Sequence, residues 1–251
     1  MTTGSAGGLE TPIETSTRVD EISDRLITAI AIGEYLPGSR LPSERDLAAS
    51  LQVGRMTVRA ALARLVEQGL IKTRRGRGGG SFIQERLPDT AASAARSSVV
   101  RILSGRWEVL KDTCEAVALL QGTICRAAAE NRSASDVVLL RECLDRFRKA
   151  SSGLESQKAD ERLHLAISAA AHNSTLQSLL LDLEARVSIS APSHLWGGAE
   201  GMPLMEARAL REHELLVQAI VDQQAAEAAH LGREHARIDL ELLEDALERS
   251  V

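Results

Sequence analysis

The sequence predicts a mainly α-helical chain with a small N-terminal domain of helices and one β-hairpin, followed by an all-α bundle of six to seven helices. Three observations carry this prediction. The length of 251 residues exceeds the usual size of one domain, which is about 100 to 200 residues. A strand-like pattern occurs only around a glycine-rich turn at 74–80. From Trp107 onward, apolar residues recur every three or four positions, and proline appears only at 192 and 203.

Two short helices separated by a tight turn are predicted between Leu41 and Gln68. Pro42 ends any secondary structure that precedes it. The hydroxyl of Ser43 can accept a hydrogen bond from the backbone N–H of Asp46. The first of these helices therefore begins at Ser43. Gly54 then supplies the break before the second helix.

The second helix opens with cationic and hydroxyl side chains and ends at Gly69. These side chains belong to Arg55, Thr57 and Arg59. Long cationic side chains at the start of a helix can reach phosphates and guanine edges in the major groove. The pair of helices therefore predicts a helix-turn-helix with a DNA-binding role.

A β-hairpin is predicted directly after the second helix. Leu70–Thr73 forms the first strand, Arg74–Gly80 the basic turn and Ser81–Ile83 the returning strand. A hairpin in this position acts as a wing, so the N-terminal domain is predicted to be a winged helix-turn-helix.

The charge distribution favours the same function. The whole chain has a net charge of -5, yet residues 39–86 contain ten Lys/Arg against four Asp/Glu. This local excess of positive charge coincides with the helix-turn-helix and suits a nucleic acid partner. The alternative is that each arginine is a solvated surface charge.

Residues 18 to 83 carry an ordered set of short motifs. They are a first helix with Val19, Ile22, Leu26 and Ile30, Leu-Pro-Ser-Glu-Arg at 41–45, Thr-Val-Arg-Xaa-Ala-Leu at 57–62, Gly-Leu-Ile at 69–71 and the glycine-rich wing. On these motifs the segment resembles the winged helix-turn-helix of the GntR family of bacterial transcription regulators.

The resemblance implies which residues contact DNA. It assigns DNA contacts to Arg45, Arg55 and Arg59, and a phosphate contact to Thr57. It also implies that Gly78 or Gly79 of the wing approaches the minor groove. The chain departs from the family at position 54, where glycine replaces the usual serine and removes a possible helix cap or phosphate contact.

Composition and pattern divide the chain into four parts. We expect a disordered tail over 1–16, the winged domain over 17–84, a linker over 85–97, and an all-helical effector-binding and dimerisation domain over 98–251. Within the linker region, Ala91–Leu103 can instead form a connecting helix.

The sequence also predicts the cellular compartment of the protein. It lacks an apolar run near 18 residues and a secretory leader, so a cytoplasmic protein with no membrane partner is expected. Cysteines occur at 114, 125 and 143, an odd number within helical patterns. Buried free thiols in a reducing cytoplasm fit them better than disulfides.

Six helices are predicted in the second domain. Their expected ranges are 107–131, 135–150, 156–171, 174–190, 204–221 and 224–249. Such an antiparallel bundle can enclose a pocket. The segment Ser190–Met205 is the one long loop inside it and is a candidate cover for one end of the bundle.

All six histidines lie in the second domain, and one of them has a carboxylate partner at helical spacing. Asp160 and His164 are four residues apart and share a helix face. A carboxylate and an imidazole so placed can reach one divalent ion, and two histidines from other helices would complete four ligands. The alternative is an ordinary surface or core pair.

Residues 98–251 resemble the ligand-binding domain of the FadR-like branch of the GntR family, known as the FCD type. The metal-binding members of that branch have four ligands in order, and the resemblance places them at Asp160, His164, His213 and His235. It therefore implies a divalent ion such as Zn²⁺, Ni²⁺ or Mn²⁺, with open positions that a small carboxylate can take. Two alternatives keep the pocket free of metal: an anionic ligand bound by the histidines, or a fatty acyl chain.

The same resemblance bears on the effector. Similar domains pair the effector carboxylate with an arginine four residues before a glutamate, and alignment on Glu115 places Lys111 there. Lysine keeps the charge but loses the bidentate fork of arginine. Arg126 and Arg186 are the other candidate effector contacts. His194, in the predicted loop, is a further candidate at the pocket mouth.

The predicted function is a homodimeric transcription regulator, most simply a repressor, that binds a near-palindromic operator in duplex DNA under the control of a small organic acid. The competing hypothesis is a metal-dependent hydrolase. The sequence does not support a hydrolase, because it places no general base beside a metal ligand. Glu212 adjoins His213 but points about 100° away from it on a helix.

Overall fold

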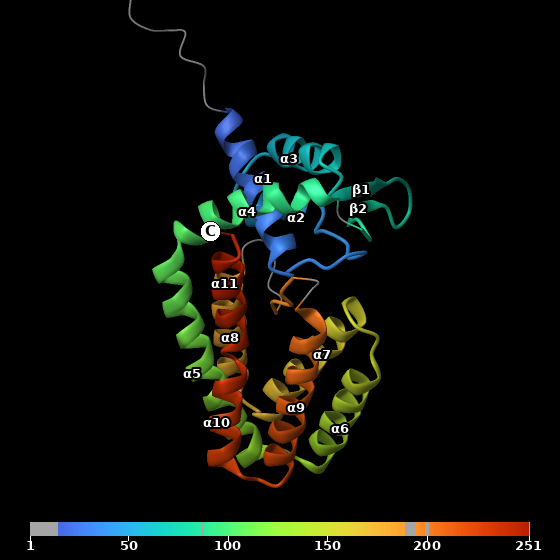
Figure 1. The fold of residues 1–251 in the computed structure, drawn as a ribbon. Helices are drawn as coiled ribbons and strands as arrows, with labels where there is room; N and C mark the ends of the chain where they lie inside the picture. Colours follow the sequence, from blue (N-terminus) through green and yellow to red (C-terminus); the bar gives the residue numbers. More distant parts are fainter. Residues whose placement is uncertain (1–14, 87, 189–193, 199–200, 251) are drawn as a thin grey trace, which may run out of the picture.

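The fold was analysed in a computed structural model, which describes residues 15–86, 88–188, 194–198 and 201–250. A small domain with a hairpin wing lies at one end, and long helices form a bundle beneath it (Figure 1). This arrangement confirms the predicted fold class.

The described part of the N-terminal domain, from residue 15 to 86, contains three helices and a two-stranded antiparallel sheet. The elements are α1 (Thr15–Ala31), α2 (Glu44–Ser50), α3 (Arg55–Glu67), β1 (Ile71–Arg74) and β2 (Gly80–Ile83). The Ser43 hydroxyl accepts a hydrogen bond from the Asp46 N–H at 3.2 Å, as predicted. Gly54 begins α3 and provides no side-chain cap.

The wing is anchored to the rest of its domain by backbone hydrogen bonds. Ile71 pairs with Ile83 at the base of the hairpin. The Leu41 N–H donates to the Ser81 carbonyl at 2.9 Å, so the chain before α2 lies against β2. The wing is therefore fixed relative to the helix-turn-helix through its second strand.

Most of the predicted linker is helical. Helix α4 spans Asp89–Ser104, which corresponds to the connecting helix considered for Ala91–Leu103. The Ser98 hydroxyl donates to the Asp24 carboxylate at 2.7 Å, and Arg101 forms an ion pair with the same group. These contacts hold α4 against α1, so the segment between the domains is a packed element.

Within the described residues, seven helices form the C-terminal bundle. They are α5 (Trp107–Asn131), α6 (Ala134–Lys149), α7 (Leu154–Ala170), α8 (Ser174–Val187), α9 (Met202–Val221), α10 (Ala225–His235) and α11 (Ile238–Glu248). Each begins within two residues of its predicted start where a separate helix was predicted.

The predicted single helix over 224–249 is wrong in one respect, because it is interrupted after His235. The Arg237 N–H bonds to the Glu234 carbonyl, three residues back, in place of the regular α-helical partner. No glycine or proline lies at this junction, so no helix-breaking residue predicted the interruption.

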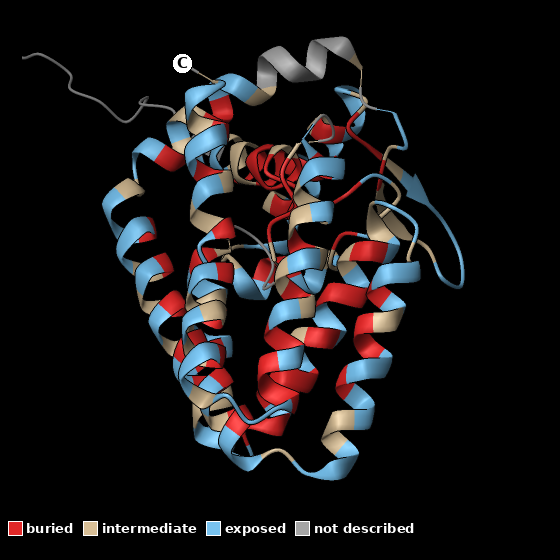
Figure 2. Ribbon diagram, turned by 60° about the horizontal axis from the view of Figure 1, so that its bottom comes forward, coloured by how far each residue is buried: buried red, intermediate tan, exposed pale blue. Residues whose placement is uncertain are grey.

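Buried residues follow the inward face of each bundle helix (Figure 2). On α5 the buried stripe has helical spacing and consists of Leu110, Cys114, Val117, Gln121, Ile124 and Ala128. Full burial of one such aliphatic side chain contributes about 1.5–3 kcal/mol to folding. The interior is thus aliphatic, and its few polar side chains stand out.

The three cysteines are buried and free, as predicted. Burial raises the pKa of both Cys114 and Cys125 to about 12 and also raises that of Cys143. We therefore expect all three to resist Ellman's reagent at pH 8 in the folded protein and to react once guanidinium unfolds it. Rapid labelling of the folded chain, followed by absorbance at 412 nm, would contradict this prediction.

Two predicted features fall partly outside the described residues. Of the tail predicted over 1–16, only Thr15 and Ser16 are described, and both belong to α1. The predicted loop Ser190–Met205 is shorter at its far end, because α9 begins at Met202. Among the described helices, none is both long and apolar enough to cross a bilayer.

Candidate metal centre, cavity and DNA-contacting surface

Four side chains from three bundle helices converge on one point. Asp160 and His164 project from successive turns of α7, His213 comes from α9, and His235 is the last residue of α10. One potential ligand atom from each lies within 4.8 Å of all the others. The structure thus brings together the four residues that the sequence resemblance assigned to a metal.

The spacing of the ligand atoms fits a single ion. The Nε2 atom of His213 lies 2.9 Å from that of His235 and 3.3 Å from that of His164. It also lies 3.4 Å from Asp160 Oδ1. Ligands bound at about 2.1 Å to one ion stand roughly 3.0–3.4 Å apart when adjacent. The cluster therefore has the dimensions of a divalent metal site.

A second carboxylate orients one of the imidazoles. His235 Nδ1 lies 2.8 Å from Glu212 Oε2, and Glu212 also accepts a hydrogen bond of 2.7 Å from Arg208 Nε. With the proton on Nδ1, the lone pair of His235 Nε2 faces the cluster. Glu212 points away from His213, as expected, but it contacts the neighbouring ligand, which helical geometry alone did not predict.

The electrostatics of the cluster favour metal ligation. Burial lowers the pKa of His213 and His164, so both imidazoles are neutral near pH 7. Burial opposes ionisation of Asp160, but the adjacent histidines outweigh it and lower the pKa of its carboxyl group. Neutral imidazoles and an ionised carboxylate are the forms that bind a divalent cation. The residues therefore fit the metal that the family resemblance implies.

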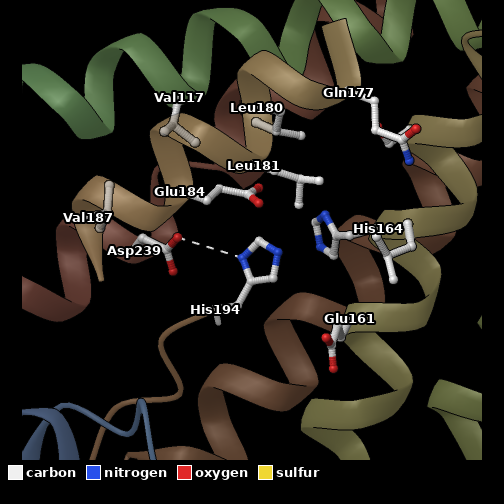
Figure 3. A pocket seen from close by; sticks show the side chains of 12 residues that line it. Val117, Glu161, His164, Gln177, Leu180, Leu181, Glu184, Val187, His194 and Asp239 are labelled. Carbon is white, nitrogen blue, oxygen red and sulfur yellow. Dashed lines mark ion pairs between the residues drawn. The ribbon is translucent and has the colours of Figure 1, made fainter. Parts of the chain in front are cut away.

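A cavity of about 70 Å³ opens beside His164 (Figure 3). Its polar wall includes Gln177, Glu184, His194 and Asp239, and leucines from α8 form much of the apolar wall. Burial raises the pKa of Glu184. The volume suits a molecule of a few non-hydrogen atoms, because one water occupies at least about 10–15 Å³ on this measure.

His194 lies inside the cavity, whereas the sequence placed it only in a loop with possible access to the pocket mouth. Its ring centre is 4.4 Å from that of His164, and its Nδ1 is 3.7 Å from Asp239 Oδ2. Burial disfavours a charged imidazole here, but Asp239 and other nearby acids outweigh it and raise the pKa of His194. The imidazole of His194 thus lies between Asp239 and the candidate metal centre.

The DNA-contacting side chains predicted on the winged domain lie at its surface. Arg45 and Arg55 are exposed, and Thr57 is half-buried in the first turn of α3. The Arg59 side chain is 61% exposed, and its Nη2 donates to Glu44 Oε2 at 2.7 Å while its Nε contacts both carboxylate oxygens at 3.1 Å. Glu44 thereby holds one edge of the Arg59 guanidinium.

The wing glycines differ in their surroundings. Gly78 has a φ of +83°, and a Cβ atom added there would meet nothing within 4 Å. Gly79 is enclosed, since a Cβ atom there would lie 2.5 Å from the Arg74 carbonyl oxygen and 2.8 Å from that of Gly76. Its own carbonyl accepts a hydrogen bond from Arg40 Nη2 at 2.6 Å. Gly79 therefore shapes the wing, and Gly78 sits at its exposed tip.

Sequence comparison matches both halves of the chain to known protein families. Residues 18–80 match the family of bacterial regulatory proteins called the gntR family, and residues 112–237 match the FCD domain. The chain belongs to the GntR family. Its members are transcription regulators and not enzymes, so the hydrolase hypothesis is set aside.

Named relatives of this GntR-family protein regulate transcription. It is 30% identical over 221 residues to Mycobacterium gastri RmpR, an HTH-type transcriptional regulator by name, with 88% of this chain and 78% of that protein covered. It is 28% identical to the Glc operon transcriptional activator of Escherichia coli K12, covering 86% and 85% of the two chains. It is 29% identical to the galactonate operon transcriptional repressor of the same strain, covering 86% and 93%.

Two solved structures align over most of this chain, each with a TM-score below 0.5. Escherichia coli McbR/YncC covers 91% of this chain and 97% of its own at 19% identity, with a TM-score of 0.44. A Streptococcus agalactiae GntR protein covers 93% and 100% at 22% identity, with a TM-score of 0.43.

The GntR-family structure does not bring the three predicted effector cations to the cavity. Lys111 is exposed on α5 and pairs with Glu108 at 3.4 Å. Arg126 is exposed on the same helix and pairs with Glu130, and Arg186 is exposed near the end of α8. Within the described part of the chain, no lysine or arginine lines this cavity. These three residues therefore do not contribute to this cavity, and their effector role stays a prediction.

Gly79→Ala is expected to deform the GntR wing, because the added Cβ would meet two backbone carbonyl oxygens. We predict a severalfold loss of DNA affinity, measured by fluorescence anisotropy, with the bundle still folded. Gly201→Ala is the matched control, since a Cβ there meets only the Gly198 carbonyl oxygen, at an ordinary contact distance of 4.0 Å. Unchanged DNA affinity in the Gly79 variant would show that the wing shape is not needed for binding.

Proposed function

We propose that this regulator binds a small organic acid beside a divalent metal ion, and that binding changes its affinity for operator DNA. Asp160, His164, His213 and His235 would hold the metal, which supplies positive charge and open coordination positions for carboxylate oxygens. Three imidazoles and one carboxylate suit Zn²⁺, Ni²⁺ and Mn²⁺. The observation that carries the proposal is the cavity that opens directly at His164.

The chemistry of the cavity supports a small anionic ligand. Its wall includes the imidazole of His194, and His164 joins the cavity to the metal cluster. A carboxylate bound here would face the metal and the imidazole of His194, which can donate a hydrogen bond, in a water-poor site. The volume of about 70 Å³ is far below what a fatty acyl chain needs, so the metal-free acyl alternative is disfavoured.

The protein would bind DNA as a homodimer on a near-palindromic operator. One recognition helix reads only a few base pairs, whereas a two-fold pair doubles the site. Repression is the simpler direction of control, since it needs only occupancy of the DNA, and the named relatives include both a repressor and an activator. The sign of the ligand effect on operator affinity would test this direction.

A thermal denaturation screen tests the effector class. Protein stripped of metal and protein reloaded with Zn²⁺, Ni²⁺ or Mn²⁺ would be heated with acetate, glycolate, malonate, citrate or a twelve-carbon fatty acid. We expect a small carboxylate to raise Tm only in the metal-loaded protein, because a ligand stabilises the state that binds it. A larger shift with the fatty acid, or equal shifts without metal, would contradict the proposal.

A further inference from the structure

Residues 194–198, here called the strap, connect the cavity with the DNA-binding domain. The strap precedes α9 in the chain, and its Leu195 and Trp196 side chains are each only 2% exposed. It therefore runs through the interior between the two halves of the molecule.

One end of the strap is held at the cavity by a single carboxylate on α11. Asp239 Oδ2 lies 3.7 Å from His194 Nδ1 (Figure 3). Asp239 Oδ1 also accepts a hydrogen bond from the Leu195 N–H at 3.3 Å. The same side chain thus fixes both the imidazole and the backbone of the strap. A ligand that draws the imidazole away from Asp239 disturbs this anchor.

The other end of the strap contacts the turn after α1. The Gly197 N–H donates to the Ile32 carbonyl at 3.0 Å. The two backbones touch without a side chain between them, because a Cβ on Gly33 would lie 2.5 Å from the Gly197 carbonyl oxygen. Gly33 also has a φ of +77°, which favours glycine. A displacement of the strap at this contact is transmitted directly to the turn.

Gln157 of α7 joins both ends of this connection. Its Nε2 lies 3.2 Å from the Gly33 carbonyl oxygen and 3.4 Å from that of His194. Gln157 is one turn before Asp160 on the same helix. One amide group therefore holds the α1 turn and the strap at a fixed distance from each other, next to the metal cluster.

We propose that His194 is an effector contact and that the strap carries occupancy of the cavity to the DNA-binding domain. The inference rests on the proposed function, since the ligand is the small carboxylate described above. The carboxylate replaces Asp239 as the partner of the imidazole, the strap loses its anchor on α11, and the Gly197–Ile32 contact shifts. The turn after α1 leads into α2 and α3, so their position on DNA changes.

Asp239→Asn imitates this release without any ligand, because the neutral amide attracts the imidazole less. The protein would be the full chain, and the DNA a duplex that it selects from a random pool. We expect the dissociation constant to change at least about fivefold, the lower end of ordinary allosteric coupling. Hydrogen–deuterium exchange should also be faster at the Gly197 amide.

Two further variants keep the test specific. Asp245→Asn, an exposed acid on α11 paired with Arg249, changes the same charge on the same helix and should leave both readouts unchanged. Gln157→Met in the wild-type chain should also accelerate exchange at the Gly197 amide, since it removes the hydrogen bond from Gln157 to the His194 carbonyl and loosens the strap.

The outcomes separate this inference from the proposed function. If a folded Asp239→Asn protein exchanges its Gly197 amide and binds DNA as the wild type does, the proposed role of the strap is wrong. This holds even if small carboxylates still stabilise the metal-loaded chain. Faster exchange at Gly197 with a changed dissociation constant supports it. Failure of every carboxylate in the thermal screen contradicts the proposed effector, and with it the role of His194 as an effector contact.

Discussion

His213→Ala is expected to reduce bound metal from one ion per chain to less than about a tenth. The imidazole is fully buried, and its Nε2 lies within 3.4 Å of three other potential ligand atoms, so it is the most central member of the cluster. Elemental analysis of protein purified without a metal-affinity column measures this directly. The wild type should gain about 2.7 kcal/mol of stability at metal concentrations 100 times Kd, and the variant should gain almost none.

Two variants keep the metal prediction falsifiable if His213→Ala folds poorly. Asp160→Asn preserves the shape of the side chain but removes the negative charge, and it should also lose metal. His230→Ala changes an exposed histidine outside the cluster and should bind metal like the wild type. Full metal content in both cluster variants would contradict the site.

Arg59→Ala is expected to weaken binding to the selected operator roughly 10- to 100-fold more than binding to random duplex DNA. A guanidinium that reads a guanine edge contributes to discrimination between sequences, whereas a phosphate contact weakens all binding alike. Glu44 occupies the Nε edge of Arg59, so the other edge remains available to a base. Anisotropy titrations of the two DNAs at one fixed salt concentration supply the comparison.

A matched arginine controls for the loss of positive charge. Arg25 lies on α1 of the same domain and pairs with Glu21, and Arg25→Ala should leave the ratio of operator to random affinity unchanged. If Arg59→Ala weakened both DNAs by the same factor, Arg59 would be a phosphate contact and base readout would lie elsewhere.

The winged domain was predictable because its signals are local. Ser43 and Gly54 mark helix starts through the chemistry of one residue and its neighbours, and both helices begin where these residues place them. The glycine-rich turn predicted the hairpin in the same way. Apolar periodicity predicted the bundle helices, since each helix packs one stripe of apolar side chains inward.

The metal cluster was only partly predictable from local pattern. The spacing of Asp160 and His164 shows a shared helix face, but His213 is 49 residues from His164 in the chain and His235 is 71 residues away. Only the tertiary packing brings them together, and the family resemblance supplied that information before the structure did. Glu212 had no sequence signal as a partner of His235, because contact between α9 and α10 decides it.

The effector contacts were the least predictable part. Lys111 had the expected position relative to Glu115, yet its side chain pairs with Glu108 at the surface. His194 occupies the cavity because Asp239 and the contact with Ile32 hold its segment in the interior. Loop positions of this kind depend on long-range contacts, which periodicity does not encode.

If occupancy of the metal-bearing cavity sets the affinity of the winged domain for DNA, an anisotropy titration of the selected operator will show it. The titration compares the metal-loaded full chain alone with the same chain saturated with the carboxylate that raises its Tm most. We expect dissociation constants that differ at least about fivefold, with the difference lost in His213→Ala. Equal dissociation constants with and without the bound carboxylate would contradict it.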